Sequence, residues 1–146
     1  MPLMPNVIRG RVLANQLVDE YVTKLSGFIP EFAEYWRSED SLFNDGDEST
    51  VYGVFSEFSE LVSVRLEADQ LEKREGLFEF IEGAVTEGGD VANAACTCFL
   101  ENILNRVPES IDPKTFVPYL GKKSREFCKA WDEFTGVYTD GLNKDV

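Results

Sequence analysis

Apolar side chains recur every three or four residues along most of the chain, which is the period of an α-helix. The first such segment, residues 12–25, has Leu13, Leu17, Tyr21 and Leu25 four residues apart, and Gly27 ends it. Residues 30–39 predict a short helix that Pro30 opens, because proline is tolerated at the first helical position. The turn-rich acidic stretch 40–49 predicts a loop.

Three further helices follow the same period. Ser49 is placed to cap a helix over residues 50–67, whose apolar stripe is Val51, Phe55, Phe58 and Val62. A second helix is expected over residues 70–86, where Gly88 and Gly89 break the pattern. Asp90 then caps a third helix that runs to Val107, just before Pro108.

The end of the chain predicts a short helical turn and one long helix. Asp112 and Pro113 are typical of the start of a helical turn. The last helix, residues 124–138, is expected to bury its aromatic side chains, which are Phe127, Trp131, Phe134 and Tyr138.

These segments predict an all-α fold. The chain of 146 residues is long enough for one sizeable core, and it shows no strand alternation, internal repeat or interdomain linker. We therefore expect one domain over residues 1–146, a bundle of about five main helices plus one or two short helices. Flexible ends are expected over roughly the first ten and the last six residues.

The helix over residues 90–107 is apolar around most of its circumference, which predicts that other helices surround it. Its polar residues follow one line at intervals of four: Asn93, Thr97, Glu101 and Asn105. Two interpretations stay open for this polar strip. It is a solvated or locally hydrogen-bonded edge, or it lines a groove that binds a partner.

Histidine is absent from the chain, which excludes Ser-His and Cys-His catalysis and histidine-bound zinc. Cys96 and Cys98 point about 200° apart on a helix, so they cannot share one metal ion or form a disulfide. With Cys128 they are expected to be free, close-packed thiols. No cofactor and no metal site are expected, and an enzyme is the least favoured class.

The net charge is −13, and its distribution is uneven. Residues 31–90 contain 17 acidic and 4 basic side chains, whereas the remainder contains 10 of each. An acidic segment of this kind disfavours direct nucleic-acid binding, which needs basic residues against phosphates. No apolar run is long enough for a membrane span, and the charged N-terminal stretch does not match a signal peptide, so a cytoplasmic protein is expected.

Two acidic features predict a binding surface for a basic protein. Carboxylates spaced three and four residues apart form one stripe of the helix at 70–86: Glu72, Glu75, Glu79 and Glu82. The loop adds Asp45, Asp47 and Glu48, which do not match the spacing of a calcium loop. The exposed aromatics Phe43 and Tyr52 would serve as anchors. A solvated acidic face without a partner is the alternative.

A basic cluster starts the last helix: Lys122, Lys123, Arg125 and Lys129. Cations at a helix N-terminus oppose the helix dipole. They either lean on the acidic half of the fold or mark a second contact surface, and the sequence leaves this choice open.

A resemblance adds to this interpretation. The central stretch "DVANAACTCFLENILNR", together with "FIPEFAEYW" before it and "PYLGKKSREFCKAW" after it, resembles an uncharacterised family of small, acidic, all-helical bacterial proteins. The matching positions are Asp90, Asn93, Ala94, Phe99, Leu100, Glu101 and Asn102. Proteins of this kind resemble cognate immunity proteins of polymorphic toxin systems, and the resemblance implies no catalytic residue.

Two functions are therefore carried forward. The first is a non-catalytic acidic protein that neutralises a basic partner, as an immunity protein would block its cognate toxin. The alternative is a helical interaction or scaffold protein that presents the groove along the polar strip to a peptide or subunit. The sequence does not decide between a monomer and a homodimer.

Overall fold

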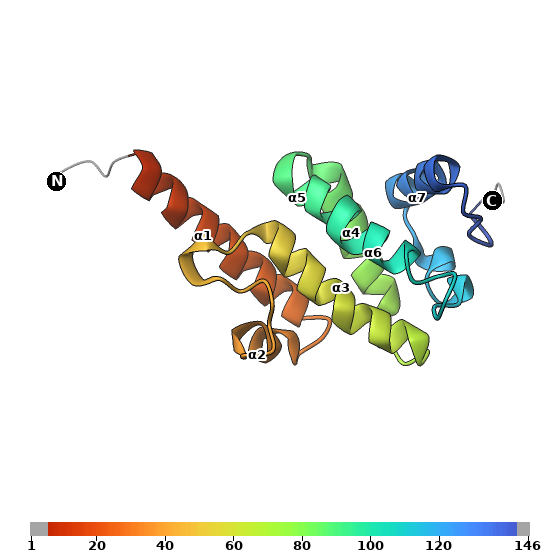
Figure 1. Cartoon of the computed structure of the whole chain (residues 1–146), viewed down its shortest axis with the longest axis horizontal. Helices are drawn as coiled ribbons and strands as arrows, with labels where there is room; N and C mark the ends of the chain where they lie inside the picture. The colour runs from red at the N-terminus through yellow and green to blue at the C-terminus, as the bar shows by residue number, and fades with distance from the viewer. Residues whose placement is uncertain (1–5, 143–146) are drawn as a thin grey trace.

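The computed structural model describes residues 6–142, with the side chains of residues 16–46 and 48–142. Every regular element in this range is helical, which confirms the all-α class (Figure 1). In chain order the elements are α1 (Asn6–Ser26), α2 (Phe32–Arg37), the 3₁₀ turn η1 (Gly46–Glu48), α3 (Val51–Glu67), α4 (Arg74–Glu87), α5 (Gly89–Ala94), the π-helical segment η2 (Ala95–Leu100), α6 (Glu101–Leu104), the 3₁₀ turns η3 (Pro113–Thr115) and η4 (Val117–Tyr119), and α7 (Lys122–Thr135).

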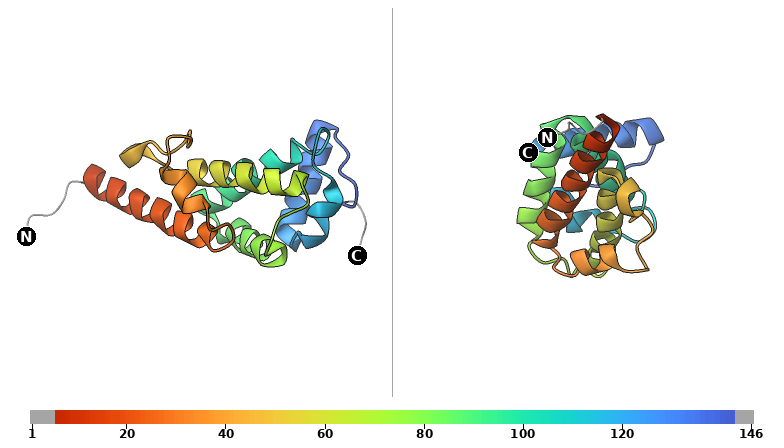
Figure 2. Two further views of the ribbon diagram at one scale, coloured as in Figure 1. Left: turned by 90° about the horizontal axis from the view of Figure 1, so that it is seen from below. Right: turned by 90° about the vertical axis from the view of Figure 1, so that its left-hand side faces the viewer.

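The helices form an elongated bundle in which α1 and α7 lie at opposite ends (Figures 1 and 2). A chain of touching phenylalanine rings runs through its core, in the order Phe32, Phe58, Phe99, Phe78 and Phe116. Their ring centroids are 5.2–6.4 Å apart, within the range of favourable aromatic pairs. One aromatic core therefore connects α2 to Phe116, the residue just before η4.

The central helix is buried as predicted, but it is not a regular α-helix. It passes through α5, η2 and α6, and the Glu101 N–H reaches back five residues to the Cys96 carbonyl. The side-chain amide of Asn102 donates to the Cys98 carbonyl (2.8 Å) and to the Ser59 hydroxyl (3.1 Å). The helix ends at Leu104 rather than Val107, because the chain then continues in turns.

The start of α3 differs from the prediction by one residue. Thr50, not Ser49, is the N-cap, and its hydroxyl accepts from the Gly53 N–H at 3.3 Å. Ser49 instead accepts from the Asp45 N–H (2.8 Å) and donates to Asn44 (3.3 Å), so it fastens the preceding loop.

The starts of α4 and α5 also differ. The predicted helix over residues 70–86 begins only at Arg74, because Asp69 and Lys73 adopt positive φ angles of 52° and 53° in a turn. Gly88, rather than Asp90, occupies the N-cap position of α5. Asp90 lies in the first turn, where its carboxylate accepts from the Tyr52 hydroxyl at 3.0 Å.

The largest difference concerns the face that α7 buries. Its buried side chains are Ser124, Cys128 and Asp132, whereas Phe134 and Tyr138 are 85% and 68% exposed. Phe127 and Trp131 are partly buried and pack against the core, as predicted in part. The prediction is wrong for Phe134 and for Tyr138, which lies beyond the end of the helix at Thr135. Polar contacts to neighbouring segments, described below, hold the polar face of α7 inward.

Smaller differences concern the ends of the first two helices. α1 already begins at Asn6, so the helix covers half of the N-terminal stretch for which flexibility was predicted. Residues 1–5 and 143–146 lie outside the described residues, as does the side chain of Leu13. α2 begins at Phe32, two residues after Pro30. The turn at Asp112 is confirmed, since its carboxylate accepts from the Lys114 N–H at 3.0 Å.

Candidate binding surfaces

The predicted acidic stripe is shorter in the structure than in the sequence. Glu75 and Glu79 lie on the exposed face of α4, but Glu72 lies in the turn before the helix. All three side chains are exposed, and none of them pairs with a lysine or arginine of the described chain. These three carboxylates are called the acidic surface below.

Glu82 has a different role, because it turns from α4 to the N-terminus of α7. Its carboxylate accepts from the backbone N–H groups of Lys123 and Ser124 and from the Ser124 hydroxyl, each at 2.8 Å. Burial raises the pKa of Glu82, but these hydrogen bonds and the nearby Lys123 lower it further, so that the pKa lies below its ordinary value of 4.5. Glu82 therefore caps a distant helix and is not available to a partner.

Close contact between the two helices accompanies this cap. A Cβ atom at Gly121, the N-cap position of α7, would lie 2.5 Å from the Glu82 side chain. Only glycine leaves room there for the carboxylate. The sequence shows that position 121, a glycine, has no side chain that could cap α7. It does not show which distant carboxylate supplies the missing acceptor.

The acidic loop is separate from the acidic surface. Asp45 and Glu48 are exposed, whereas the side chain of Asp47 lies outside the described residues. Figure 2 shows the loop before α3 on one side of the molecule and α4 on the other. The structure therefore does not bring the two acidic groups into one site. Among the described residues, no three Asp, Glu or Cys side chains are arranged to hold a metal ion.

A buried carboxylate that the sequence analysis missed fastens this loop. Glu57 of α3 is 1% exposed and accepts from the backbone N–H groups of Leu42 (2.5 Å) and Phe43 (2.8 Å) and from the Ser41 hydroxyl (3.2 Å). It fixes the loop so that Leu42 and Phe43 remain exposed. The available signal was the position of Glu57 between the apolar residues of α3.

The polar strip follows the solvent-exposed edge of the central helix. Asn93, Thr97 and Asn105 are exposed, and the Thr97 hydroxyl donates to the Asn93 carbonyl at 2.7 Å. Glu101 is half-buried, and burial raises the pKa of its carboxyl group. At the α6 end of the strip lies a pocket of about 370 Å³, which is lined by Phe43, Ser56, Glu60, Asn102, Asn105 and Arg106.

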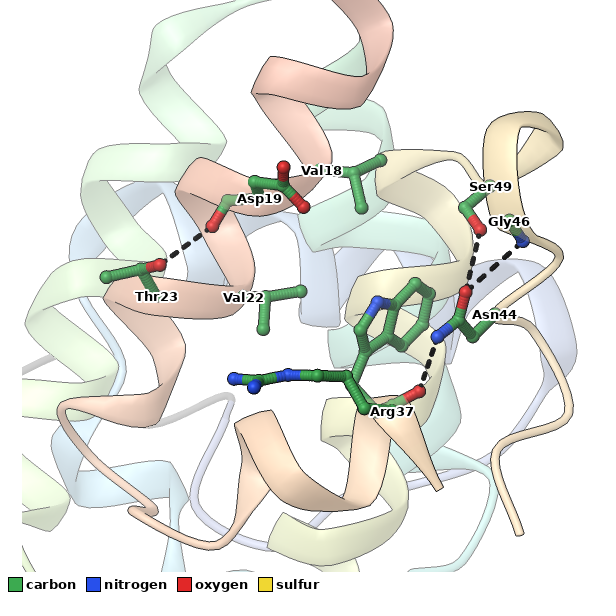
Figure 3. A pocket seen from close by; sticks show the side chains of 9 residues that line it. Val18, Asp19, Val22, Thr23, Arg37, Asn44, Gly46 and Ser49 are labelled. Carbon is green, nitrogen blue, oxygen red and sulfur yellow. Dashed lines mark hydrogen bonds between the residues drawn. The ribbon is translucent and has the colours of Figure 1, made fainter. Parts of the chain in front are cut away.

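A second pocket, of about 450 Å³, lies between α1, α2 and the loop before α3 (Figure 3). Figure 3 shows Asp19 and Thr23 projecting from α1, with Asn44 and Ser49 on the opposite wall. Asn44 closes that wall by donating to the Trp36 carbonyl at 2.7 Å. The pocket offers one carboxylate and, from Arg37, one guanidinium.

The basic cluster is divided between two roles. Arg125 is part of the fold, since its guanidinium donates to the carbonyls of Val117 (2.9 Å) and Gly141 (3.1 Å). Lys123 pairs with Glu126 at 3.2 Å, Lys129 is half-buried, and Lys122 is exposed. Among the described residues, the hydrogen bond from the Lys123 N–H to Glu82 connects this cluster to the acidic half.

All three cysteines are free thiols, as predicted. Cys128 is buried, and burial together with Asp132 and Cys96 raises its pKa to about 12, despite the opposing effect of Arg125. Burial and Glu82 also raise the pKa of Cys96. Protonated thiols are poor nucleophiles, and Cys128 packs within the hydrophobic core.

Comparison with known protein families gives a match that covers most of the chain. A family profile described as a domain of unknown function, DUF7674, matches residues 22–136. The chain belongs to the DUF7674 family. The match extends from the second half of α1 through α7 and includes the acidic surface, the polar strip and the Glu82 cap. Neither a curated protein nor a solved structure matches the chain. Among the described helices of this family member, none is both long and apolar enough to cross a membrane.

Proposed function

We propose that this DUF7674 protein is a non-catalytic, cytosolic binding protein that engages a basic protein partner through its acidic surface. The observation that carries the proposal is the state of Glu75 and Glu79. They are exposed one turn apart on α4, and no lysine or arginine of the described chain pairs with either. Like charges at this spacing destabilise a helix by about 0.2–0.5 kcal/mol, so the pair does not serve folding.

Three of the four basic residues of the acidic segment are already engaged elsewhere. Arg65 pairs with Glu31 at 2.8 Å, and Arg74 pairs with Asp69 at 3.0 Å. The ammonium group of Lys73 donates to the Gly27 carbonyl at 2.9 Å. Among the residues whose side chains are described, no lysine or arginine forms an ion pair with the acidic surface. A cationic partner would supply the opposite charge, speed its own encounter and be favoured over neutral or acidic competitors.

The shape of α4 supports close approach by a partner. Gly76 and Gly83 are exposed on the same helix, and a methyl group at Gly83 would meet no other atom within 4 Å. Glycine within a helix costs about 1 kcal/mol relative to alanine, and the fold gives no packing reason for it at Gly83. Without side chains at these two positions, partner side chains can reach the glutamates and the helix backbone.

A finer form of the proposal follows from the sequence resemblance. If the partner is a toxin domain of nuclease type, the carboxylates of Glu75 and Glu79 would occupy a cationic site that otherwise holds phosphates. The protein would then act as the cognate immunity protein. The support for this role is the resemblance together with the uncompensated carboxylates, and the nature of the partner tests it.

The experiment is a pull-down from a native lysate of the source organism with stepwise salt elution. The test variant carries Glu75→Lys and Glu79→Lys, and the control carries Glu34→Lys and Glu39→Lys on exposed positions around α2. Each substitution adds two charges, so both variants have a net charge of −13 + 4 = −9. A basic protein retained by the wild type and the control, but bound more than about tenfold more weakly by the test variant, supports the proposal.

Equal loss of the partner in both variants would show that overall charge, rather than the acidic surface, determines binding. Retention in both would remove the acidic surface from the proposal. For an identified partner, its own activity is then assayed with and without this protein. An active partner that remains uninhibited in the complex contradicts the immunity role.

The pocket beside the polar strip favours the second function, an interaction protein with a groove. Phe43 is half exposed there, beside the amides of Asn102 and Asn105. Such a groove would bind a peptide or subunit with little dependence on salt. A partner that survives high salt, is lost with Asn105→Arg and is retained by the α4 variant would favour this function over the first.

A further inference from the structure

The outer face of α7 carries exposed apolar side chains, beside Phe127 and Trp131, which are partly buried against the core. Phe134 is 85% exposed, and Ala130 lies beside it in solvent. Trp131 is partly exposed and contacts Phe134, with ring centroids 6.5 Å apart. Phe127 continues the face toward the start of the helix, and Val137 and Tyr138 extend it beyond the end. These six residues are called the aromatic face.

Specific polar contacts on the opposite side determine the orientation of this face. Ser124 is held by Glu82 at the start of α7. Asp132 accepts from the Thr139 N–H (2.7 Å) and hydroxyl (2.8 Å) near its end, and both residues are buried. With both ends fixed, α7 cannot rotate its aromatic residues inward without breaking these bonds. An exposed aromatic patch on a fixed helix is typical of an interaction surface.

The charge of the α7 segment suits a second copy of the chain as the occupant. Two molecules with a net charge of −13 repel each other, and the segment 31–90 carries that excess. Residues 121–142 contain 4 basic and 4 acidic side chains, so this segment is neutral overall. The part of the acidic segment that packs on α7 is α4, where the Glu82 carboxylate is already bound at the start of the helix.

The order of charges along α7 favours an antiparallel pair. The exposed Lys122 and Lys123 lie at the start of the helix, and the exposed Glu133 and Asp140 lie near and beyond its end. An antiparallel copy places each basic end beside an acidic end, and the two-fold axis repeats this contact. We infer that the protein forms a homodimer in which the aromatic faces of two α7 helices pack antiparallel.

The side-chain sizes fit this arrangement. Around a two-fold axis near Ala130 and Trp131, the small Ala130 of one helix faces the indole of the other. Phe127 and Phe134 are equally distant from that axis in sequence, so Phe127 of one copy faces Phe134 of the other. An alanine–indole contact therefore lies at the centre of the interface, with a pair of phenylalanine rings on either side, and aromatic pairs of this kind are favourable.

The mass of the full chain in solution, measured by light scattering over a range of concentrations, tests this inference. The wild type is expected to approach twice 16.5 kDa. Phe134→Glu places a charge in the aromatic face and should weaken the dimer by more than about tenfold. Leu42→Glu is the matched control, because Leu42 is also 85% exposed but lies in the loop before α3. It should leave the dimer unchanged.

A charge exchange tests the antiparallel arrangement. Lys123→Glu should weaken the dimer, whereas the double variant Lys123→Glu with Glu133→Lys should restore it, because residues 123 and 133 then again carry opposite charges. Intrinsic fluorescence gives an independent readout. Trp36 is already buried at 5% exposure, so a blue shift with rising concentration reports burial of Trp131.

A wild type that stays monomeric at all concentrations would overturn the inference, as would equal dimerisation of the Phe134→Glu and Leu42→Glu variants. A dimer that the double charge exchange fails to restore would overturn the antiparallel arrangement. The result does not depend on the acidic surface, since neither Glu75 nor Glu79 belongs to the aromatic face.

Discussion

Glu79 and Glu82 show how two neighbouring residues of one type acquire different roles. Three positions apart on α4, they look equivalent on a helical projection. In the structure Glu79 is exposed and without a cationic partner in the described chain, whereas Glu82 accepts three hydrogen bonds at the start of α7. The difference arises from the position of α7, which only the tertiary fold determines.

Removing the Glu82 cap should destabilise the protein. We expect Glu82→Ala to lower the free energy of unfolding by about 1–2 kcal/mol, because the N–H groups of Lys123 and Ser124 lose their acceptor. Glu79→Ala is the control and should change it by less than about 0.5 kcal/mol. Urea titration measures both. Equal losses in the two variants would contradict a capping role for Glu82.

The same carboxylate predicts a pH dependence. The folded pKa of Glu82 lies below its ordinary value of 4.5, so protons bind more readily to the unfolded state. The stabilisation is therefore fully present above about pH 4.5 and is lost as the pH falls through the folded pKa. Between neutral pH and strong acid, the difference in unfolding free energy between wild type and Glu82→Gln should shrink. A difference that is constant with pH would contradict this assignment.

Glu57 should determine the order of the loop that carries Leu42 and Phe43. Glu57→Ala removes the acceptor of two backbone N–H groups and should cost about 2–3 kcal/mol of stability. Amide hydrogen exchange should accelerate at those two residues. Glu60→Ala, which removes a partly exposed ion pair with Arg106, should cost less than about 1 kcal/mol and leave the loop protected.

At the scale of elements, the sequence periodicity was most informative for helices that other helices surround. The burial of Phe55, Phe58 and Val62 on α3 could be predicted because apolar stripes indicate the core. The same rule failed for α7, where polar contacts of Ser124 and Asp132 occupy the inner face. Periodicity does not distinguish an aromatic stripe that packs internally from one that faces a partner.

The π-helical segment could not be predicted either, since one additional residue per turn leaves the apolar pattern almost unchanged. The stability of the π-helical segment should depend on Asn102, whose side-chain amide donates hydrogen bonds to the Cys98 carbonyl and the Ser59 hydroxyl. We expect Asn102→Ala to lower the free energy of unfolding by about 1–2 kcal/mol. Asn105→Ala, on the exposed strip of the same helix, should have almost no effect in urea titration.

The candidate site could be predicted only in part. Helical spacing placed Glu75 and Glu79 on one face, and both are exposed there. It also included Glu72, which a turn with positive φ at Lys73 separates from the helix, and Glu82, which the fold uses. The loop that contains Asp45 and Glu48 lies on another side of the molecule from α4 (Figure 2), which the charge pattern along the sequence does not reveal.

At the scale of the whole molecule, the excess charge and the apolar surface are separated. The segment 31–90 carries a net charge of −13, whereas the aromatic face belongs to the neutral segment 121–142. Figure 1 shows α7 of this segment at one end of the bundle. Charged surfaces promote long-range attraction, and apolar surfaces promote stable short-range contact. The separation allows one protein to form a dimer through α7 while the acidic surface remains open to a basic partner.

This charge distribution predicts that one substitution stabilises the isolated protein and impairs the proposed function. Glu79→Lys converts the like-charge pairs that residue 79 forms with Glu75 and Glu82 into opposite-charge pairs. It should raise the free energy of unfolding by about 0.5–1 kcal/mol at low salt. Glu109→Lys makes the same change in net charge within the neutral remainder of the chain and should have little effect. Urea titration is suitable because urea, unlike guanidinium, leaves the ionic strength unchanged.

Salt separates this electrostatic gain from a change in packing. At about 1 M salt the screening length falls to roughly 3 Å, so the advantage of Glu79→Lys should disappear if it is electrostatic. An increase in the free energy of unfolding that persists at high salt, or that Glu109→Lys reproduces, would contradict this prediction. It would show that repulsion within the acidic surface does not destabilise the fold. Since residues that serve binding are often unfavourable for stability, a gain confined to Glu79→Lys and to low salt would mark the acidic surface as selected for a partner rather than for the fold.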